Sequence, residues 1–503
     1  MNIQEIIETK RDNNKLSKEQ IEYFITNYTN GDITDYQAAA LIMAIYINGM
    51  DEDEITDLTL AMANSGDILN LSELGIVVDK HSTGGIGDKV TLILAPIIAS
   101  LRIPVAKMSG RGLGYTGGTA DKLESIPGYN VVLEEKEFIQ NVKEIGISLI
   151  TQTANLAPAD KKIYALRDSI NCVESIPLIA SSIMSKKIAS GADKIVLDVT
   201  YGSGAFMKTI QDAKMLAETM EKIGKLAGRE TVAVMTGMDQ PLGKYVGNTL
   251  EVIEAVEALN GKWQEDVKEV VLLLGAYMIK LAGKGENIEE NKNKMLNQIS
   301  NGEALNKFKE LVERQGGDVS YIENIEKFKK AKYKMAGIST KRGIVNKLNA
   351  ESVGKIAMML GAGRTCKEDD IVKEVGIELN KKVGDKVEIG DVLAYIHGNS
   401  EELTEKAVID LRNVYEIEKN TYIADTPGFA TFEISEIESK DLEKYFIEFR
   451  PFIKDCEFIG CTHIKEENCG IKQAVKEGKI SLDRYERFCK IYEQLKEGEK
   501  RKW

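Results

Sequence analysis

Two glycine-rich segments carry most of the residues that could do chemistry. Residues 80–91 read KHSTGGIGDKVT, and residues 107–119 read KMSGRGLGYTGGT. Glycines let backbone N–H groups crowd around an anion, and Lys and Ser or Thr side chains can complete such a site. The pattern therefore predicts that the two segments hold an anion of the size of phosphate between them.

The elements around these segments are typical of an α/β fold. Strand-like runs at residues 76–78 and 103–105 precede the two segments, and further runs occur at 195–199 and 231–235. From residue 74 to about 330 such runs alternate with helical patterns, which predicts a mostly parallel, helix-covered sheet. Loops at the ends of strands are where an open sheet of this kind binds ligands.

The beginning of the chain is expected to be helical. Ser17 with Gln20, and Thr34 with Gln37, have the spacing of a capping box at the start of a helix. We expect a small helical domain from residues 1–65 together with about 160–192. The larger α/β, phosphate-binding domain is then expected from residues 66–159 together with 193–334.

A small β-rich domain is expected over residues 335–418. Within it, residues 376–397 read GIELNKKVGDKVEIGDVLAYIH, in which short β-runs alternate with Gly-Asp turns. This pattern resembles the hammerhead fold of biotinyl and lipoyl carrier domains. No acceptor lysine in a Met-Lys-Met-like context stands at a hairpin tip, so a structural domain is favoured over a carrier.

Composition limits the remaining possibilities. The chain has 503 residues and a net charge of -13, which argues against nucleic-acid binding by the chain as a whole. The N-terminus lacks the apolar core of a signal peptide, and no apolar run has the length of a membrane span. Six cysteines without a framework pattern do not indicate a secreted disulfide protein. We expect a soluble, cytoplasmic protein.

Residues 109–124, SGRGLGYTGGTADKLE, resemble the signature of thymidine and pyrimidine-nucleoside phosphorylases. The resemblance extends to KHSTGG at 80–85, YALRD at 164–168 and SSIMSKK at 181–187, in unbroken order over about residues 1–418. It implies reversible phosphorolysis of uridine, thymidine and deoxyuridine to the free base and a (deoxy)ribose 1-phosphate. Inorganic phosphate is then the co-substrate, no nucleotide cofactor is needed, and a homodimer through the helical domain is expected.

The resemblance also implies roles for individual residues. Arg167 and Lys186 are expected to face the base carbonyl oxygens, where negative charge grows as the base departs. His81 is expected to hydrogen-bond or protonate the 2-oxo group, a role for a group that titrates near neutrality. The remaining expected contacts are Ser182 and Tyr164 at the base, and Lys80, Ser82, Thr91, Lys107, Ser109 and Thr119 at phosphate.

Three further features refine the comparison. Lys107 is typical of the broad pyrimidine-nucleoside phosphorylases and predicts that uridine is accepted in addition to thymidine. Tyr115 stands where the family usually has His, in GLGHTGG. Some members bind potassium, and the matching positions here are Gly87, Lys89, Leu242, Tyr245 and Glu254. At Lys89 and Tyr245 the backbone carbonyls are expected to serve as ligands.

The composition changes near residue 419. Four of the six cysteines and none of the 16 methionines lie beyond this point. Cys456, Cys461, His463 and Cys469 form a Cys3His set that suits tetrahedral, structural Zn²⁺, with reduced unliganded thiols as the alternative. Together with DTPGF at 425–429, this set resembles the C-terminal end of RsgA-type ribosome-assembly GTPases. Because the chain has no G-x-x-x-x-G-K-[ST] loop and no Asn-Lys-x-Asp pattern, residues 419–503 are predicted to be a partial GTPase end without GTP hydrolysis.

Two alternatives stay open at this point. An anthranilate phosphoribosyltransferase-like enzyme shares the plan of a helical domain, an α/β domain and glycine-rich loops. It would need Mg²⁺ and acidic residues for pyrophosphate, and it would lack the expected base site. From a different class, the tail could act as a zinc-dependent ribosome- or RNA-binding module.

Overall fold

The computed structural model divides into two compact units, Met1–Asn420 and Thr421–Trp503. The structure describes residues 1–112, 114–115, 117–153, 155–364, 369–418 and 438–500. Each unit has its own hydrophobic core. The two units are therefore described separately.

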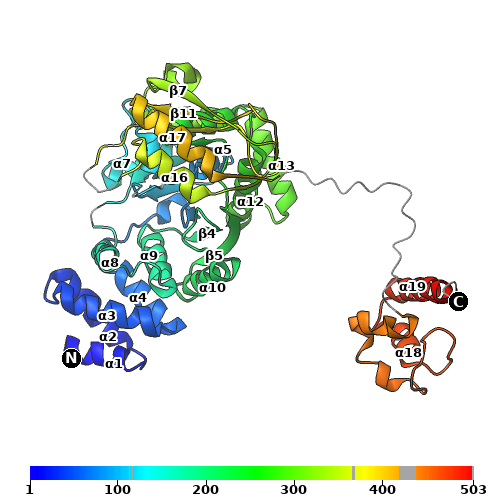
Figure 1. Cartoon of the computed structure of the whole chain (residues 1–503). Helices are drawn as coiled ribbons and strands as arrows, with labels where there is room; N and C mark the ends of the chain where they lie inside the picture. Colours follow the sequence, from blue (N-terminus) through cyan, green and yellow to red (C-terminus); the bar gives the residue numbers. More distant parts are fainter. Residues whose placement is uncertain (113, 116, 154, 365–368, 419–437, 501–503) are drawn as a thin grey trace. The chain divides into compact units, whose positions relative to one another are not determined.

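A helical bundle begins the first unit (Figure 1). The predicted capping boxes are confirmed, since Ser17 with Gln20 and Thr34 with Gln37 each start a helix. Side chains of the N-terminal helices share one buried cluster with Ile163 and Leu178 from later in the chain. The helices of the bundle are α1 (Ile3–Arg11), α2 (Lys18–Asn30), α3 (Asp35–Asn48), α4 (Glu52–Ala63), α8 (Pro158–Ser169) and α9 (Ile176–Ala189).

Parallel strands form the centre of the α/β part, as predicted. β1 (Val78–Ser82), β4 (Lys194–Tyr201) and β5 (Glu230–Gly237) make one sheet, and β2 (Val105–Ser109) pairs with β3 (Ile147–Thr151) in another. The covering helices include α5 (Val90–Ser100), α6 (Thr119–Leu123), α7 (Glu135–Ile145), α10 (Ile210–Leu226), α11 (Asn248–Leu259), α12 (Glu265–Leu281), α13 (Ile288–Ser300), α14 (Glu303–Arg314) and the short α15 (Ser320–Glu323).

The strand boundaries differ from the prediction in one important respect. Lys80, His81 and Ser82 lie on β1, and Lys107 and Ser109 lie on β2, rather than in the loops that follow. Backbone pairing with the neighbouring strands continues through these polar residues, because ladder hydrogen bonds do not depend on side-chain type. Side chains expected on loops are thus fixed on sheet positions.

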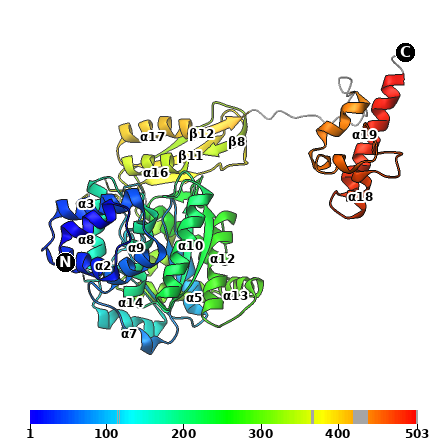
Figure 2. The ribbon, with the colours of Figure 1, turned by 90° about the horizontal axis from the view of Figure 1, so that it is seen from below.

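Two antiparallel sheets and two helices complete the first unit. Figure 2 shows α16 (Ala350–Met359) and α17 (Glu401–Val414) beside these strands. The sheets have the strand orders β6-β9-β11-β7 and β10-β8-β12. Their strands are β6 (Tyr245–Val246), β7 (Tyr333–Ile338), β8 (Gly343–Leu348), β9 (Gly376–Leu379), β10 (Lys386–Val387), β11 (Val392–Gly398) and β12 (Tyr415–Glu418).

The described part of the tail, residues 438–500, contains helices and no strand. Phe446, Phe449 and Phe488 are buried and pack with their rings about 5 Å apart. The DTPGF segment lies outside the described residues. The helical elements are the 3₁₀ turns η3 (Ser439–Tyr445), η4 (Ile447–Phe449) and η5 (Ile453–Asp455), and the α-helices α18 (Gly470–Lys476) and α19 (Leu482–Lys500).

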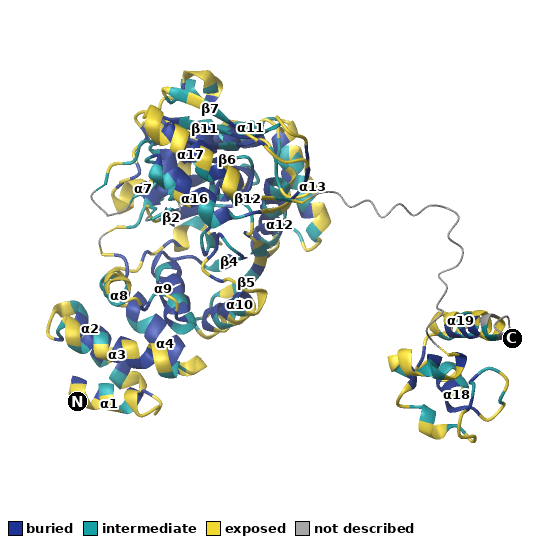
Figure 3. Ribbon diagram, in the orientation of Figure 1, coloured by how far each residue is buried: buried dark blue, intermediate teal, exposed yellow. Residues whose placement is uncertain are grey.

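Figure 3 shows which parts of the first unit are buried and which are exposed. α5 and α9 are buried along most of their length, whereas α1 and α2 bury one face. Along the described ranges, no helix is both long and apolar enough to cross a membrane.

Removal of residues 421–503 should leave the first unit intact. Among the described residues, the five buried clusters of that unit are built from its own side chains, so the unit has a core of its own. We expect the melting temperature of the first unit to change by less than about 2 °C in differential scanning calorimetry. A much lower melting temperature of the truncated chain would show that the tail is integral to this unit.

Candidate active site

Asp79 on β1 is the buried carboxylate at the centre of the site. Lys107 Nζ on β2 donates to Asp79 Oδ1 at 3.1 Å, and Lys187 Nζ on α9 donates to Asp79 Oδ2 at 2.6 Å. Lys107 Nζ also donates to the carbonyl of Lys80. Burial raises the pKa of Asp79, but Lys107 and Lys187 outweigh it and bring the pKa below its ordinary value. One carboxylate thus joins β1, β2 and α9.

Lys107 has a different position from the one expected for a phosphate ligand. Its ammonium group is buried and turned to Asp79 and the backbone of β1. Burial is the main cause that lowers the pKa of Lys107 to about 7; Asp79 opposes the shift, and Lys187 and Lys80 add to it. With a pKa of about 7, Lys107 carries only part of a positive charge near neutral pH, so Asp79 does not face two full ammonium charges.

Lys80 occupies the first half of the expected phosphate site. Its buried Nζ lies 3.2 Å from Asp198 Oδ2 on β4 and 3.8 Å from Asp88 Oδ2 in the first loop. Within the described residues it makes no hydrogen bond of good geometry. Ser82 Oγ accepts the N–H of Gly84 at 3.2 Å. A buried ammonium group beside a glycine-rich loop, with N–H donors that are not used in hydrogen bonds, is suited to an anionic ligand.

His81 is a neutral imidazole in this environment. Burial lowers the pKa of His81 well below 6.5, and the positive charges of Lys187, Lys107, Lys186 and Lys80 lower it further. The imidazolium form is thus disfavoured, which argues against the expected titration near neutrality. A neutral His81 can still donate one hydrogen bond.

Lys186 and Ser182 lie together on α9, as the expected base site requires. Lys186 Nζ donates to Ser182 Oγ at 3.0 Å and to Asp160 Oδ2 on α8 at 2.6 Å. The other oxygen, Asp160 Oδ1, is buried and makes no hydrogen bond within the described residues. Tyr164, one turn further along α8, is half-buried. The Lys186 ammonium group is thus held in place while 19% of its side chain stays exposed.

Arg167 holds the connection between α8 and α9. The guanidinium is buried and donates to the carbonyls of Cys172 at 3.2 Å, Leu178 at 3.1 Å and Val173. Burial lowers the pKa of Arg167, against the attraction of Asp160. In this arrangement Arg167 acts as a clamp within the helical bundle rather than as an exposed cation at the base.

The second glycine-rich loop is held by the C-terminal domain. Arg364 donates to the carbonyl of Gly112 at 3.1 Å and to Asp121 Oδ1 at 2.8 Å. Tyr115 packs against the buried cluster of that domain, and Lys355 Nζ lies 5.9 Å from its ring centroid. Tyr115 therefore contacts a second domain. Ser109, Thr91 and Thr119 are half-buried at the end of β2 and in the first turns of α5 and α6.

The residues expected to bind potassium lie together, but they surround the side chain of Lys89. Lys89 Nζ lies within hydrogen-bond distance of Leu242 O, Tyr245 O and Glu254 Oε2. The expectation that Lys89 offers its backbone carbonyl to an ion is thus wrong, because its own ammonium group is at the centre of the ligand set.

Several partners of these residues were not predicted. Asp79 adjoins Lys80 in sequence and Lys187 is the last residue of the SSIMSKK motif, and these are the signals that could have pointed to them. The unpredicted residues that pair with the site or hold its loops are Asp79, Asp88, Asp121, Asp160, Lys187, Asp198 and Arg364.

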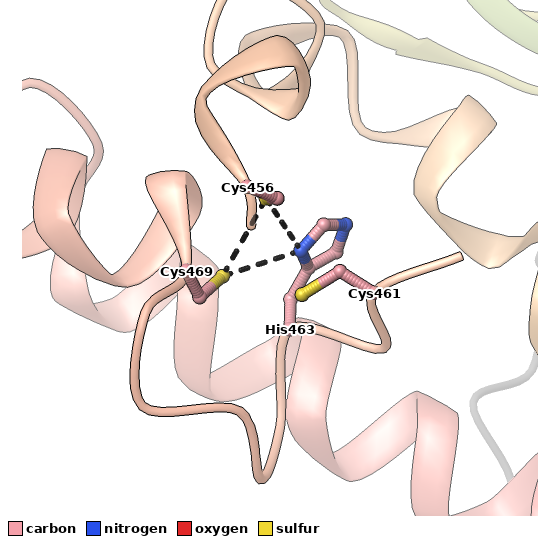
Figure 4. Close-up of side chains that lie close together, drawn as sticks. All are labelled: Cys456, Cys461, His463 and Cys469. Atoms are coloured by element: carbon pink, nitrogen blue, oxygen red, sulfur yellow. Dashed lines mark hydrogen bonds between the residues drawn. The ribbon is translucent and has the colours of Figure 1, made fainter. Parts of the chain in front are cut away.

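In the tail, Cys456, Cys461, His463 and Cys469 form one cluster (Figure 4). Their ligand atoms all lie within 4.8 Å of one another. His463 Nδ1 is 3.6 Å from Cys456 Sγ and 3.3 Å from Cys469 Sγ, while Nε2 lies 2.8 Å from Glu443 Oε2. A carboxylate on the second nitrogen orients an imidazole for a metal. The cluster fits a metal ion.

Comparison with known proteins decides the family. Three family models match: a glycosyl transferase family helical bundle domain at residues 4–66, a glycosyl transferase family a/b domain at 74–305, and a pyrimidine nucleoside phosphorylase C-terminal domain at 344–418. A pyrimidine-nucleoside phosphorylase of Staphylococcus haemolyticus is 55% identical over 402 residues, which are 80% of this chain and 93% of that protein. This chain belongs to the pyrimidine-nucleoside phosphorylase family. A pyrimidine-nucleoside phosphorylase of Staphylococcus aureus is 53% identical over 404 residues, which are likewise 80% of this chain and 93% of that protein.

A solved structure agrees on the fold. Anthranilate phosphoribosyltransferase from Thermus thermophilus superposes with a TM-score of 0.52 over 62% of this chain and 99% of its own, at 18% identity. At this identity the likeness concerns the fold alone. The family models match up to residue 418, and the resemblance of the tail to RsgA-type GTPases stays a prediction.

Protonation of His81 should destabilise the folded protein. Because its pKa is below 6.5 in the folded state, the unfolded chain binds this proton more readily, and stability that is present above pH 6.5 is lost as the pH falls. We expect the melting temperature to fall more steeply between about pH 7.5 and 5.5 in the wild type than in His81→Gln. Differential scanning fluorimetry over this range measures both slopes, and parallel slopes would contradict the assignment.

Proposed function

We propose that the protein catalyses the reversible phosphorolysis of pyrimidine nucleosides, with uridine, thymidine and deoxyuridine as substrates. The observation that carries the proposal is the pair of positioned lysines, Lys80 on β1 beside Asp198 and Lys186 on α9 beside Asp160, in the motifs that the family shares. Relatives more than 50% identical carry the name pyrimidine-nucleoside phosphorylase. The products would be the free base and a (deoxy)ribose 1-phosphate.

On the phosphate side, Lys80 is the proposed principal cation. Ser82, Ser109, Thr91 and Thr119 would supply hydroxyl groups, and the glycine-rich loops would supply backbone N–H donors. Lys107 would act through Asp79 and the backbone of β1, as a positioning residue, since its ammonium group is turned to these partners. Phosphate would attack C1′ directly, and no covalent enzyme intermediate is needed.

On the base side, Lys186 is the proposed cation for the charge that develops on the departing base. Asp160 and Ser182 hold its ammonium group, which favours a fixed electrostatic contribution over proton transfer. A neutral His81 would donate a hydrogen bond to the 2-oxo group. Tyr164 would line the base, and Arg167 would contribute by holding the α8–α9 connection.

A homodimer is the proposed assembly, through the helical bundle. α3 exposes Tyr36, Met43 and Ile47, which follow one another at helical spacing on a single face. The exposed fractions are 75%, 38% and 71%. An apolar stripe of this kind on an exposed helix is typical of an interface.

Phosphate-dependent release of uracil from uridine and of thymine from thymidine tests the function. We expect release by the purified protein without added Mg²⁺, measured by chromatography of the free base. Lys186→Ala should lower kcat/KM by about 100-fold or more, because it removes a positioned charge. Lys161→Ala, which changes an exposed lysine on α8, should leave kcat/KM within about twofold. Absence of phosphate-dependent release would overturn the proposal.

For the tail we propose a structural Zn²⁺ on Cys456, Cys461, His463 and Cys469. Four protein ligands close the coordination sphere, which favours a structural over a catalytic ion. The ion would fix η5, α18 and the segment between them.

Zinc content tests this site. We expect one zinc ion per chain by mass spectrometry of the purified protein, lost in Cys461→Ser and retained in Cys489→Ser, which changes a cysteine outside the cluster. Chelation should unfold the tail and leave nucleoside phosphorolysis unchanged, because the two units are separate. A zinc-free protein with a folded tail would contradict the proposal.

A further inference from the structure

Lys89 is a fully buried lysine at the start of α5, immediately after the first glycine-rich loop. Its Nζ donates to Leu242 O at 2.7 Å, to Tyr245 O at 2.9 Å and to Glu254 Oε2 at 2.7 Å. An ammonium group has three N–H donors and no acceptor, so these three oxygens satisfy it completely. The site consists of two backbone carbonyls, one carboxylate and a cation that belongs to the chain.

Backbone carbonyls and a carboxylate are also the ligands that a potassium ion takes, since carbonyl oxygens can replace its hydration shell. Three of the positions expected from the family resemblance for potassium, Leu242, Tyr245 and Glu254, are the partners of Lys89. The residues therefore do not fit a metal ion here, because the ammonium group already takes the oxygens that would bind it.

The backbone packs closely around the Lys89 ammonium group. A Cβ on Gly243 would lie 2.7 Å from Lys89 Nζ and 2.4 Å from Glu254 Oε1, and Gly243 has a φ of 74°. A Cβ on Gly87 would lie 2.6 Å from Leu242 O. The segment 242–245 thus wraps closely around the lysine, and glycine is needed where it turns.

This contact joins the first glycine-rich loop to distant parts of the unit. Lys89 ends that loop, and Leu242 N donates to Ile86 O in the same loop at 3.0 Å. The segment then continues into β6, which pairs with β9 of the C-terminal domain. Glu254 also accepts the N–H groups of Lys244 and Tyr245, both at 2.9 Å. The ammonium group of Lys89 therefore fixes the position of the first glycine-rich loop relative to β6.

We infer that Lys89 serves as a built-in monovalent cation, so that the fold and activity of this protein are independent of potassium. A variant that removes the ammonium group and leaves the oxygen ligands should then become potassium-dependent. The activity part of this inference rests on the proposed phosphorolysis, whereas the stability part does not.

The experiment compares wild type with Lys89→Ser, a change that leaves a small side chain and three oxygens without their ammonium donor. Melting temperatures are measured in choline chloride and in KCl at equal ionic strength of about 100 mM. We expect no difference for wild type, and for Lys89→Ser a rise of about 3 °C or more with K⁺ that saturates as binding does. Uridine phosphorolysis by Lys89→Ser should rise with K⁺ in parallel.

Lys10→Ser is the matched control. Lys10 is also a buried lysine, and its Nζ donates to the two carboxylate oxygens of Glu54 at 2.8 and 3.1 Å, so its removal leaves one carboxylate without the pair of backbone carbonyls that surrounds Lys89. This variant should be less stable in both salts, with no response to K⁺.

Either of two results would overturn the inference. One is a wild-type protein whose melting temperature rises with K⁺. The other is a folded Lys89→Ser protein that is destabilised and does not respond to K⁺, which would make Lys89 an ordinary buried ion pair. If Lys89→Ser does not fold, the wild-type comparison still decides. A protein inactive in every salt but with the expected melting temperatures would refute the proposed function alone.

Discussion

The buried carboxylate of Asp79 is the interaction on which the arrangement of the site depends. It accepts hydrogen bonds from Lys107 of β2 and Lys187 of α9 while it lies on β1 itself. Without it two ammonium groups would be buried with no counter-charge, and breaking a buried pair of this kind costs about 3–5 kcal/mol. The helical bundle and the two parallel sheets are therefore joined by electrostatics as well as by apolar packing.

The same principle recurs around the candidate active site. Lys80 lies between Asp198 and Asp88, Lys186 is held by Asp160, and Lys89 by Glu254. Each carboxylate fixes a lysine on a sheet or helix, so the positive charge is placed before any ligand arrives. His81 is neutral because these charges surround it. The arrangement suits a reaction in which an anion attacks and an anion departs.

The sequence correctly predicted the features that depend on residues close together in the chain. The capping boxes at Ser17 and Thr34, the strands over 195–199 and 231–235 and the Cys3His set all follow from spacing within a few residues. The contacts of Lys107 and Lys89 were not predicted. Their partners stand 28 residues away for Lys107 and 165 for Lys89, and no short-range pattern records such pairs.

By itself, the sequence determined that helices and strands alternate and that the motifs are those of the pyrimidine-nucleoside phosphorylase family, and it predicted an anion site at two glycine-rich segments. Only the tertiary structure decided where each charge goes. It turned Lys107 toward Asp79, used Arg167 as a clamp, and placed the ammonium group of Lys89 on Glu254 and two carbonyls. The physical reason is that the energy of a buried charge depends on neighbours supplied by the fold and not on its own residue type.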